Sequence, residues 1–149
     1  MATSDVTIRR IEAADETEWR RLWTAYLEFY ETSVPEDVYR TTFARLLGDG
    51  EFEPNGFIAS KNGSPVGLVH YIQHRTCWSQ KNNCYLQDLY ADPDARGTGI
   101  GRALIEAVYE EADRLGLANV YWLTQEHNAT ARQLYDRVAR NTKYIRYMR

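Results

Sequence analysis

The sequence has little of what marks a nucleic-acid-binding, membrane-spanning or disulfide-stabilised protein. Its 18 Lys and Arg residues face 21 Asp and Glu, so the net charge of −3 provides no basic surface for a phosphate backbone. No run of about 18 apolar residues is present, which predicts no membrane span. The chain has two cysteines, Cys77 and Cys84, and no apolar segment near residue 1. We therefore expect free thiols and a cytoplasmic location.

What the chain does have is enough apolar sequence for one ordinary folded unit. Its 149 residues are 44% hydrophobic, which predicts a single domain over residues 1–149. Tyrosine stands out with 11 copies, beside four tryptophans. Such rings suit a core and also a groove that binds cations. The composition indicates no metal site.

Hydrophobic periodicity predicts ten secondary-structure elements. We expect strands over 6–12, 57–60, 66–75, 85–91, 120–124 and 144–148, and helices over 15–30, 35–47, 99–115 and 128–139. Hairpins come first and strand–helix–strand units follow, which predicts an α/β fold with a mixed, mostly antiparallel sheet and helices on both faces.

Two helices and one strand carry the expected core. The apolar stripe of the first helix is Trp19, Leu22, Trp23, Tyr26, Leu27 and Tyr30. That spacing leaves Glu28 on the solvent side. The inner face of the 99–115 helix is Ile100, Leu104, Val108 and Leu115. The strand over 120–124 contains no charge, so we expect it to be buried on both faces.

The segment DARGTGIGRALIEAV, residues 94–108, places three glycines at alternate positions where a helix begins. Glycines allow backbone N–H groups to converge on an anion, and the helix N-terminus adds a positive dipole. Arg96 and Arg102 add full charges. The spacing is not the G-x-G-x-x-G of a dinucleotide fold, and no Gly-Lys-Ser/Thr follows as in a P-loop. A tight loop that only packs helix against strand remains the alternative.

Two motifs resemble the GNAT superfamily of N-acetyltransferases. The first is R-G-x-G-I-G over 96–101, after a strand that ends L-x-A-D-P over 89–93. The second is YWLT over 121–124, followed by the N-x-x-A-x-x-L-Y pattern over 128–135. The segment YLQDLY over 85–90 is similar to the diamine acetyltransferases and to a fungal group that acetylates histones or small amines. The first half of the chain matches only in general layout.

The resemblance implies acetyl-CoA as the cofactor and a GNAT-like sheet that opens between the 85–91 and 120–124 strands. The implied pyrophosphate loop is Arg96, Gly97, Thr98, Gly99, Ile100, Gly101 and Arg102. The backbone of Leu89, Tyr90 and Ala91 would pair with the pantetheine arm, as an added strand does. A free N–H near Tyr90 would polarise the thioester carbonyl. Asn128 and Ala131 would line the other side.

The implied reaction is direct attack of a primary amine on the thioester in a ternary complex. Tyr135 occupies the usual general-acid position of the superfamily. The base is open, because Gln87 stands where diamine enzymes often have a glutamate, and an amide accepts no proton at neutral pH. Asp88 is adjacent, although strand alternation points it to the opposite face. Glu126 is the other candidate, and ordered water is a third.

The acceptor site is expected to combine aromatic walls with polar groups, as suits an ammonium group. Its expected members are Phe29, Tyr30, Trp78, Gln87 and Trp122. Polyamines, amino acids, other small cationic amines and lysine side chains all remain possible acceptors. Two other functions also remain open: a non-catalytic acyl-CoA-binding module, and a transferase that uses a different acyl group.

The end of the chain departs from the family pattern. Residues 138–149 read VARNTKYIRYMR and leave room for one strand where many relatives have two. A sheet edge left without a partner strand favours pairing with another chain. We therefore expect a homodimer that uses the C-terminal strand, with a small-molecule amine as the other partner and neither nucleic acid nor membrane.

Overall fold

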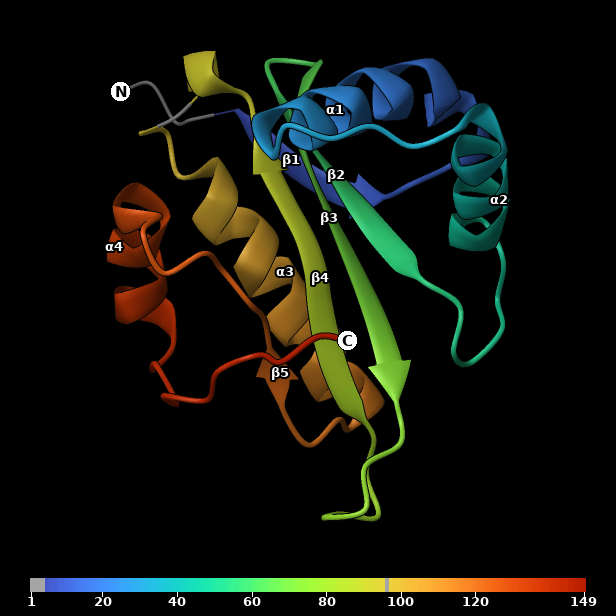
Figure 1. The fold of residues 1–149 in the computed structure, drawn as a ribbon. Coiled ribbons are helices and arrows are strands. Elements are labelled where there is room, and N and C mark those ends of the chain that lie inside the picture. The colour runs from blue at the N-terminus through green and yellow to red at the C-terminus, as the bar shows by residue number, and fades with distance from the viewer. Residues whose placement is uncertain (1–4, 96) are drawn as a thin grey trace.

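The computed structural model describes residues 5–95 and 97–149, which form one five-stranded sheet with helices packed on it (Figure 1). The strands are β1 (Val6–Arg10), β2 (Asn55–Lys61), β3 (Ser64–His74), β4 (Asn83–Ala91) and β5 (Val120–Tyr121). The helices are α1 (Glu16–Phe29), α2 (Glu36–Leu46), α3 (Ile100–Leu115) and α4 (Ala129–Val138), with short 3-10 turns η1 (Ala13–Asp15) and η2 (Pro93–Ala95). No helix in these described ranges is long and apolar enough to cross a membrane.

The sheet has the mixed architecture that the element order predicts. Its strands lie in the order β1-β2-β3-β4-β5, antiparallel except for the parallel pair β4–β5. Helices α1 and α2 lie on one face, and α3 and α4 lie on the other (Figure 1). The parallel pair has only two registered positions, Cys84 with Val120 and Tyr85 with Tyr121. Beyond Tyr85 the two strands diverge, so the sheet is splayed at this point.

The α1 stripe is buried as its spacing predicts. Trp19, Leu22, Trp23 and Leu27 are buried, Tyr26 and Tyr30 are half-buried, and Glu28 is exposed. Trp19 stacks on Trp23 with ring centroids 6.2 Å apart and contacts Phe43 of α2 at 5.1 Å. Aromatic packing between α1, α2 and the sheet therefore forms the first half of the core.

The second half of the core lies under α3. Ile100, Leu104 and Val108 are buried as predicted, but the prediction for Leu115 is wrong because this side chain is 39% exposed. Leu115 is the last helical residue, and the next residue, Gly116, turns the chain away with φ +70°. The helix therefore ends before its final side chain reaches the sheet.

The predicted burial of the 120–124 strand is also wrong. Only Val120–Tyr121 pairs with the sheet, and the side chains of Tyr121 and Leu123 are 38% and 50% exposed. The reason is the position of β5: it is an edge strand, and it separates from β4 after two residues.

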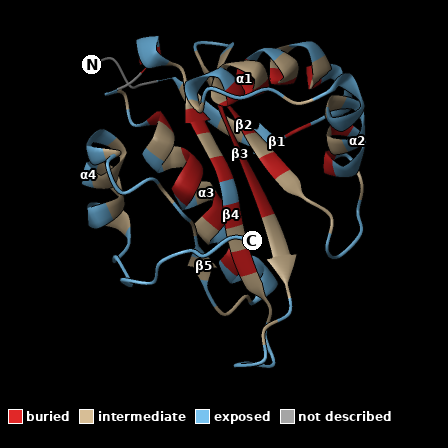
Figure 2. Ribbon diagram, in the orientation of Figure 1, coloured by how far each residue is buried: buried red, intermediate tan, exposed pale blue. Residues whose placement is uncertain are grey.

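The strand predicted over 144–148 is absent. Residues 139–149 have no helix or strand, and every one of them is exposed. A strand needs a neighbour, and β5 offers only two paired residues at its end of the sheet. The tail nevertheless carries large apolar side chains: Tyr144, Ile145, Tyr147 and Met148 are 74–88% exposed. Figure 2 shows buried residues concentrated in the sheet, α1 and α3, and none along α4 or the tail.

Candidate active site

A β-bulge in β4 decides where the acidic side chain next to the splay points. In the β3–β4 register, His70 lies opposite Asp88 while the next residue, Tyr71, lies opposite Leu86. Gln87 is therefore an extra residue without a partner, and the alternation of side chains restarts after it. Asp88 consequently lies on the α1 face beside its partner His70. The prediction that Asp88 points to the face opposite Gln87 is wrong, because both residues line the same pocket.

Asp88 is buried and belongs to a short chain of polar contacts. Its exposed fraction is 9%, and that of His70 is 2%. The Nδ1 atom of His70 lies 3.0 Å from Oδ2 of Asp88. On the other side of the ring, Nε1 of Trp19 donates to Nε2 of His70 at 3.0 Å. His70 thus holds the Asp88 carboxylate in place, and Trp19 of α1 holds the His70 ring in turn.

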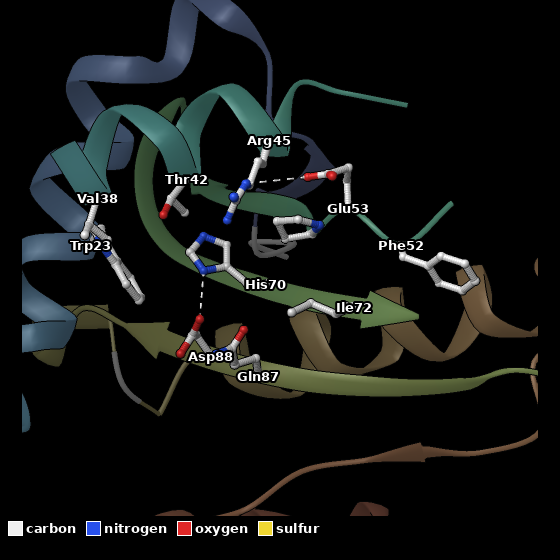
Figure 3. A pocket seen from close by; sticks show the side chains of 11 residues that line it. Trp23, Val38, Thr42, Arg45, Phe52, Glu53, His70, Ile72, Gln87 and Asp88 are labelled. Carbon is white, nitrogen blue, oxygen red and sulfur yellow. Dashed lines mark hydrogen bonds and ion pairs between the residues drawn. The ribbon is translucent and has the colours of Figure 1, made fainter. Parts of the chain in front are cut away.

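The pocket in front of Asp88 has a volume of about 420 Å³, which suits a small molecule. Its lining residues are Trp23, Val38, Thr42, Arg45, Phe52, Glu53, Pro54, His70, Ile72, Gln87 and Asp88. Figure 3 shows Arg45 reaching from α2 toward the His70 ring, with Asp88 and Gln87 below it on β4. The pocket therefore presents a buried carboxylate and an arginine on neighbouring walls.

Tyrosines surround the same carboxylate. Burial, together with the neighbouring Asp88 charge, raises the pKa of Tyr26 far above its ordinary value. Burial and the Asp88 charge also raise the pKa of Tyr30. A phenol with a raised pKa keeps its proton at neutral pH and can only donate to a carboxylate. Two tyrosines and His70 therefore present hydrogen-bond donors near Asp88.

The glycine-rich segment has the backbone needed to hold an anion. Gly97 and Gly99 adopt φ of +80° and +82°, a conformation that residues with a side chain rarely adopt. Gly99 is the N-cap of α3 and has no side chain with which to cap the first turn. The N–H groups of that turn can therefore bind an anion. Arg96 lies outside the described residues, and Arg102 is an exposed residue whose Nε contacts Glu106 at 2.8 Å.

The edge of β4 next to the glycine segment is open to a second backbone. Leu89 and Ala91 pair with β3 on one side, whereas β5 pairs with β4 only as far as Tyr85. The polar groups of the following residues on that edge can therefore bond an extended ligand arm. The Oγ1 atom of Thr124, across the splay, is buried and has no partner among the described residues. These features fit the pantetheine arm and diphosphate of coenzyme A.

Helix α4 closes the other side of the splay. Asn128 caps it as predicted, since its side chain accepts from the N–H of Ala131 at 3.4 Å. The ring of Tyr135 packs edge-on against Trp122, with centroids 5.4 Å apart. Burial and the nearby Tyr30 raise the pKa of Tyr135 to about 12. The Tyr135 phenol thus stays protonated at neutral pH and lies near the end of α1.

Several expected site residues are not brought to the pocket. Glu126 is exposed in a turn, where its carbonyl accepts from Arg132. Trp78 is 90% exposed on the loop between β3 and β4, because that loop extends away from the helices (Figure 1). Trp122 packs with the α3 and α4 cluster and not with the pocket residues. Phe29 is 52% exposed and contacts Tyr30 edge-on at the end of α1.

Sequence reasoning missed His70 and Arg45. His70 interrupts an otherwise apolar run in β3, and a histidine at a core position of a strand requires a polar partner. That signal was present in the sequence. Arg45 offered no such signal, because an arginine near the end of a helix is ordinary.

A splayed mixed sheet beside a glycine-opened helix is the architecture of an acyl-CoA-dependent N-acetyltransferase, and the sequence agrees. Residues 19–139 match the model of the Acetyltransferase (GNAT) family. The chain belongs to this family and is an N-acetyltransferase, as the two sequence motifs predicted.

Two curated relatives align with nearly the whole chain. It is 39% identical to the D-amino-acid N-acetyltransferase HPA3 of Saccharomyces cerevisiae, over 100% of this chain and 93% of that protein. It is 28% identical to the uncharacterized N-acetyltransferase YhfO of Bacillus subtilis, over 95% of each. Among solved structures, aminoglycoside N-acetyltransferase AAC(6')-Iy in complex with CoA superposes with a TM-score of 0.84 at 18% identity, covering 99% of this chain and 96% of that one. This last likeness concerns the fold.

Proposed function

We propose that residues 1–149 form one catalytic domain that transfers the acetyl group of acetyl-CoA to the α-amine of a small amino acid. The observation that carries this proposal is the buried Asp88 carboxylate, which the β4 bulge turns into a pocket that Arg45 also lines. A carboxylate attracts an ammonium group, and an arginine binds a carboxylate. A zwitterionic acceptor satisfies both.

Arg45 is the part of the pocket that favours an amino acid over a polyamine. Its Nε lies 3.9 Å from Oε2 of Glu53, a long ion pair in which the arginine side chain is 61% exposed. The guanidinium therefore keeps donors for a ligand carboxylate, which it can bind in the bidentate manner typical of arginine. The name of the yeast relative, a D-amino-acid N-acetyltransferase, supports this choice of acceptor.

Asp88 and Tyr135 carry out two proton transfers in the proposed reaction. Acetyl-CoA, when bound, supplies an acetyl group activated as a thioester. Asp88 takes a proton from the acceptor ammonium at its carboxylate and so releases the lone pair of the amine. Tyr135 holds a proton at Oη, because burial raises its pKa to about 12, and gives it to the departing sulfur. The N–H near Tyr90 stabilises charge on the acyl oxygen.

Binding of the cofactor follows the sequence prediction. We assign the diphosphate to the backbone of Gly97, Thr98 and Gly99 and the first turn of α3, with Arg96 and Arg102 as flanking charges. The pantetheine arm lies along the open edge of Leu89 to Ala91. Asn128 and Ala131 face it from α4. The open β4 edge and the uncapped helix support these assignments.

The acceptor assignment is tested with pairs of amines that differ only in a carboxylate. We expect release of coenzyme A with D- or L-phenylalanine and much less with phenethylamine. Arg45→Gln should raise KM for the amino acid about 10- to 100-fold, because a charge-assisted bidentate contact is lost. KM for phenethylamine should stay unchanged. Arg40→Gln, on the exposed side of the same helix, is the matched control. Equal activity on both amines would contradict the acceptor class.

The catalytic roles are tested by two conservative substitutions. Asp88→Asn should lower kcat/KM at least about 100-fold and leave cofactor affinity nearly unchanged, because the amide cannot take a proton. Tyr135→Phe should lower kcat about 10- to 100-fold with little change in KM for the amine. Glu126→Gln is the control and should retain activity. If Glu126→Gln were inactive and Asp88→Asn active, the base would be Glu126.

We also propose that the tail over 139–149 pairs with a second copy of the chain to form a homodimer. The support is its row of exposed apolar side chains beside the short edge strand β5. Sedimentation at micromolar concentration should show a dimer for the full chain and a monomer after deletion of residues 140–149. The double variant Tyr144→Ser, Tyr147→Ser should weaken the dimer without unfolding the monomer. A full chain that sediments as a monomer would remove the proposal.

A cytoplasmic location completes the proposal. Both cysteines are free, the exposed Cys77 and the buried Cys84. Burial raises the pKa of the Cys84 thiol to about 12, so this thiol is unreactive. Free thiols suit a reducing compartment.

A further inference from the structure

The contacts around His70 determine where its proton lies. The indole Nε1–H of Trp19 is a donor without acceptor capacity, so the Nε2 atom of His70, 3.0 Å away, must accept. A ring nitrogen that accepts a hydrogen bond carries no proton. The proton of neutral His70 is therefore on Nδ1, from which it donates to Oδ2 of Asp88 at 3.0 Å.

We infer that Trp19 and His70 form a tautomer lock that fixes the proposed base: Trp19 holds His70 in the Nδ1–H form, and His70 then aims and stabilises the ionised carboxylate of Asp88. His70 is on this view a positioning residue and not a proton carrier. This inference rests on the proposed role of Asp88 as the base. It concerns two residues that have no part in the cofactor site.

The surroundings keep His70 neutral. Protonation would place a second N–H against the Trp19 donor, inside a site where His70 is 2% exposed. The ring also contacts Trp23, with centroids 5.0 Å apart. The charged and titratable groups that line its pocket are Asp88 from β4 and Arg45 and Glu53 from α2 and the segment after it, and Tyr26 of α1 lies beside Asp88. Arg45 and Glu53 pair with each other, and Asp88 is the charged group to which His70 is hydrogen-bonded.

The lock has a consequence for catalysis. One oxygen of Asp88, Oδ2, is occupied by the Nδ1–H of His70. This hydrogen bond fixes the orientation of the Asp88 carboxylate before the acceptor arrives. A carboxylate has about four lone-pair sites, so Asp88 can also accept the ammonium proton beside its His70 and Tyr26 donors. A carboxylate at the same place without the His70 hydrogen bond would be free to rotate.

The tautomer can be measured in the free enzyme without any substrate. The chain has three histidines, so 15N-labelled wild type gives few ring signals, and His70→Asn identifies those of His70. We expect the Nδ1–H tautomer of the neutral ring. In Trp19→Phe the ring should populate the Nε2–H tautomer. A wild-type His70 in the Nε2–H form would overturn the lock.

The positioning role is measured with two replacements of His70. The Asn side chain can place an N–H near the position of Nδ1, whereas Phe cannot. We expect His70→Phe to lower kcat about 30-fold or more, with little change in KM. His70→Asn should restore most of kcat. Equal losses of kcat in the two variants would show that His70 only fills space.

These results separate the lock from the proposed function. If Asp88→Asn keeps full activity while the NMR tautomer is as expected, the base is wrong and the lock is a structural contact only, which overturns the inference. If Asp88→Asn is inactive but His70 is in the Nε2–H form, the proposed function stands and the lock falls. Thermal melts of every variant distinguish loss of the fold from loss of the lock.

Discussion

The segment before residue 113 and the segment after it are held together in different ways. The first contains β1–β4, α1, α2 and nearly all of α3, and it includes every buried residue that the structure describes, the last being Ala112. The second contains β5, α4 and the tail, and none of its residues is buried (Figure 2). Helix α4 is attached by partly buried contacts such as Leu134 and by the hydrogen bond from Tyr109 Oη to the Val138 carbonyl at 2.7 Å.

This difference separates the two proposed binding functions. The acceptor pocket lies in the segment with a dense core, so Asp88 and His70 are fixed before any ligand binds. The far wall of the cofactor site, including Asn128 and Tyr135, lies in the segment without one. Regions with few buried contacts open most readily, so we expect this wall to gain order when the cofactor fills the splay. Three predictions test the contrast.

The largest expected effect comes from matched leucine substitutions in the two segments. Leu104 is fully buried in α3, whereas Leu123 is 50% exposed after β5. Leu104→Ala should lower the free energy of unfolding by about 2–5 kcal/mol, through lost burial and a cavity. Leu123→Ala should lower it by less than about 1 kcal/mol. Urea denaturation of both variants measures this. Equal losses would mean that the second segment has a core of its own.

Ligand binding should give an effect of intermediate size, concentrated in the second segment. Coenzyme A at about 100 times its Kd should stabilise the fold by about 2.7 kcal/mol. Hydrogen–deuterium exchange should slow most over 119–138 and over 97–102, and little in β2 and β3. D-Pantethine at the same concentration is the control, since it lacks the diphosphate. Uniform protection would contradict the view that the cofactor orders a loosely held wall.

The smallest expected effect concerns a charge at the edge of the first segment. Arg9 makes two hydrogen bonds of 2.7 Å to Asp15, and the Glu12 N–H donates to the same carboxylate at 2.7 Å. The Arg9 hydrogen bonds hold the pKa of Asp15 below its ordinary value, against the effect of burial. The contribution of ionised Asp15 to the free energy of unfolding is therefore present above about pH 4. It is lost as the pH falls through the pKa of Asp15 in the folded state. Asp15→Asn should cost about 2 kcal/mol at pH 7.

The acid limb provides the check on that prediction. Unfolding free energies of wild type and Asp15→Asn, measured from pH 7 down to about pH 2, should converge as Asp15 protonates. Glu106→Gln, which breaks the exposed pair with Arg102, should change stability by less than about 0.5 kcal/mol. A constant gap between wild type and Asp15→Asn at all pH values would show that the carboxylate charge is not what stabilises this edge.

The sequence predicted those parts of the fold that depend on local patterns. The α1 stripe, the Asn128 cap and the glycine-opened α3 follow from spacing and backbone chemistry, and all three are present. The tail strand was wrong, because its formation depends on a neighbour that the pattern of 144–148 does not contain. Leu115 was wrong because α3 ends at this residue and Gly116 turns the chain away from the sheet.

The site was harder to predict because its geometry depends on a bulge and on long-range contacts. A single unpaired residue, Gln87, shifts the phase of β4, and nothing in the local alternation reveals it. The contact between Trp19 and His70 joins residues 51 positions apart. The exposure of Trp78 depends on the direction of a loop. Residue types suggested the chemistry, but only the strand register brought Asp88 to the pocket.

The unpaired Gln87 also limits how the acceptor pocket of this enzyme can be redesigned. The alternation of side chains in β4 shifts by one residue at Gln87: Leu86 faces α3 before the bulge, and Leu89 faces α3 after it. Deleting Gln87 would remove the bulge. Either Asp88 would then point into the apolar core under α3, or a leucine of β4 would point into the acceptor pocket. Redesign of the acceptor specificity is therefore safest through α2, whose side chains reach the same pocket without setting the phase of the sheet.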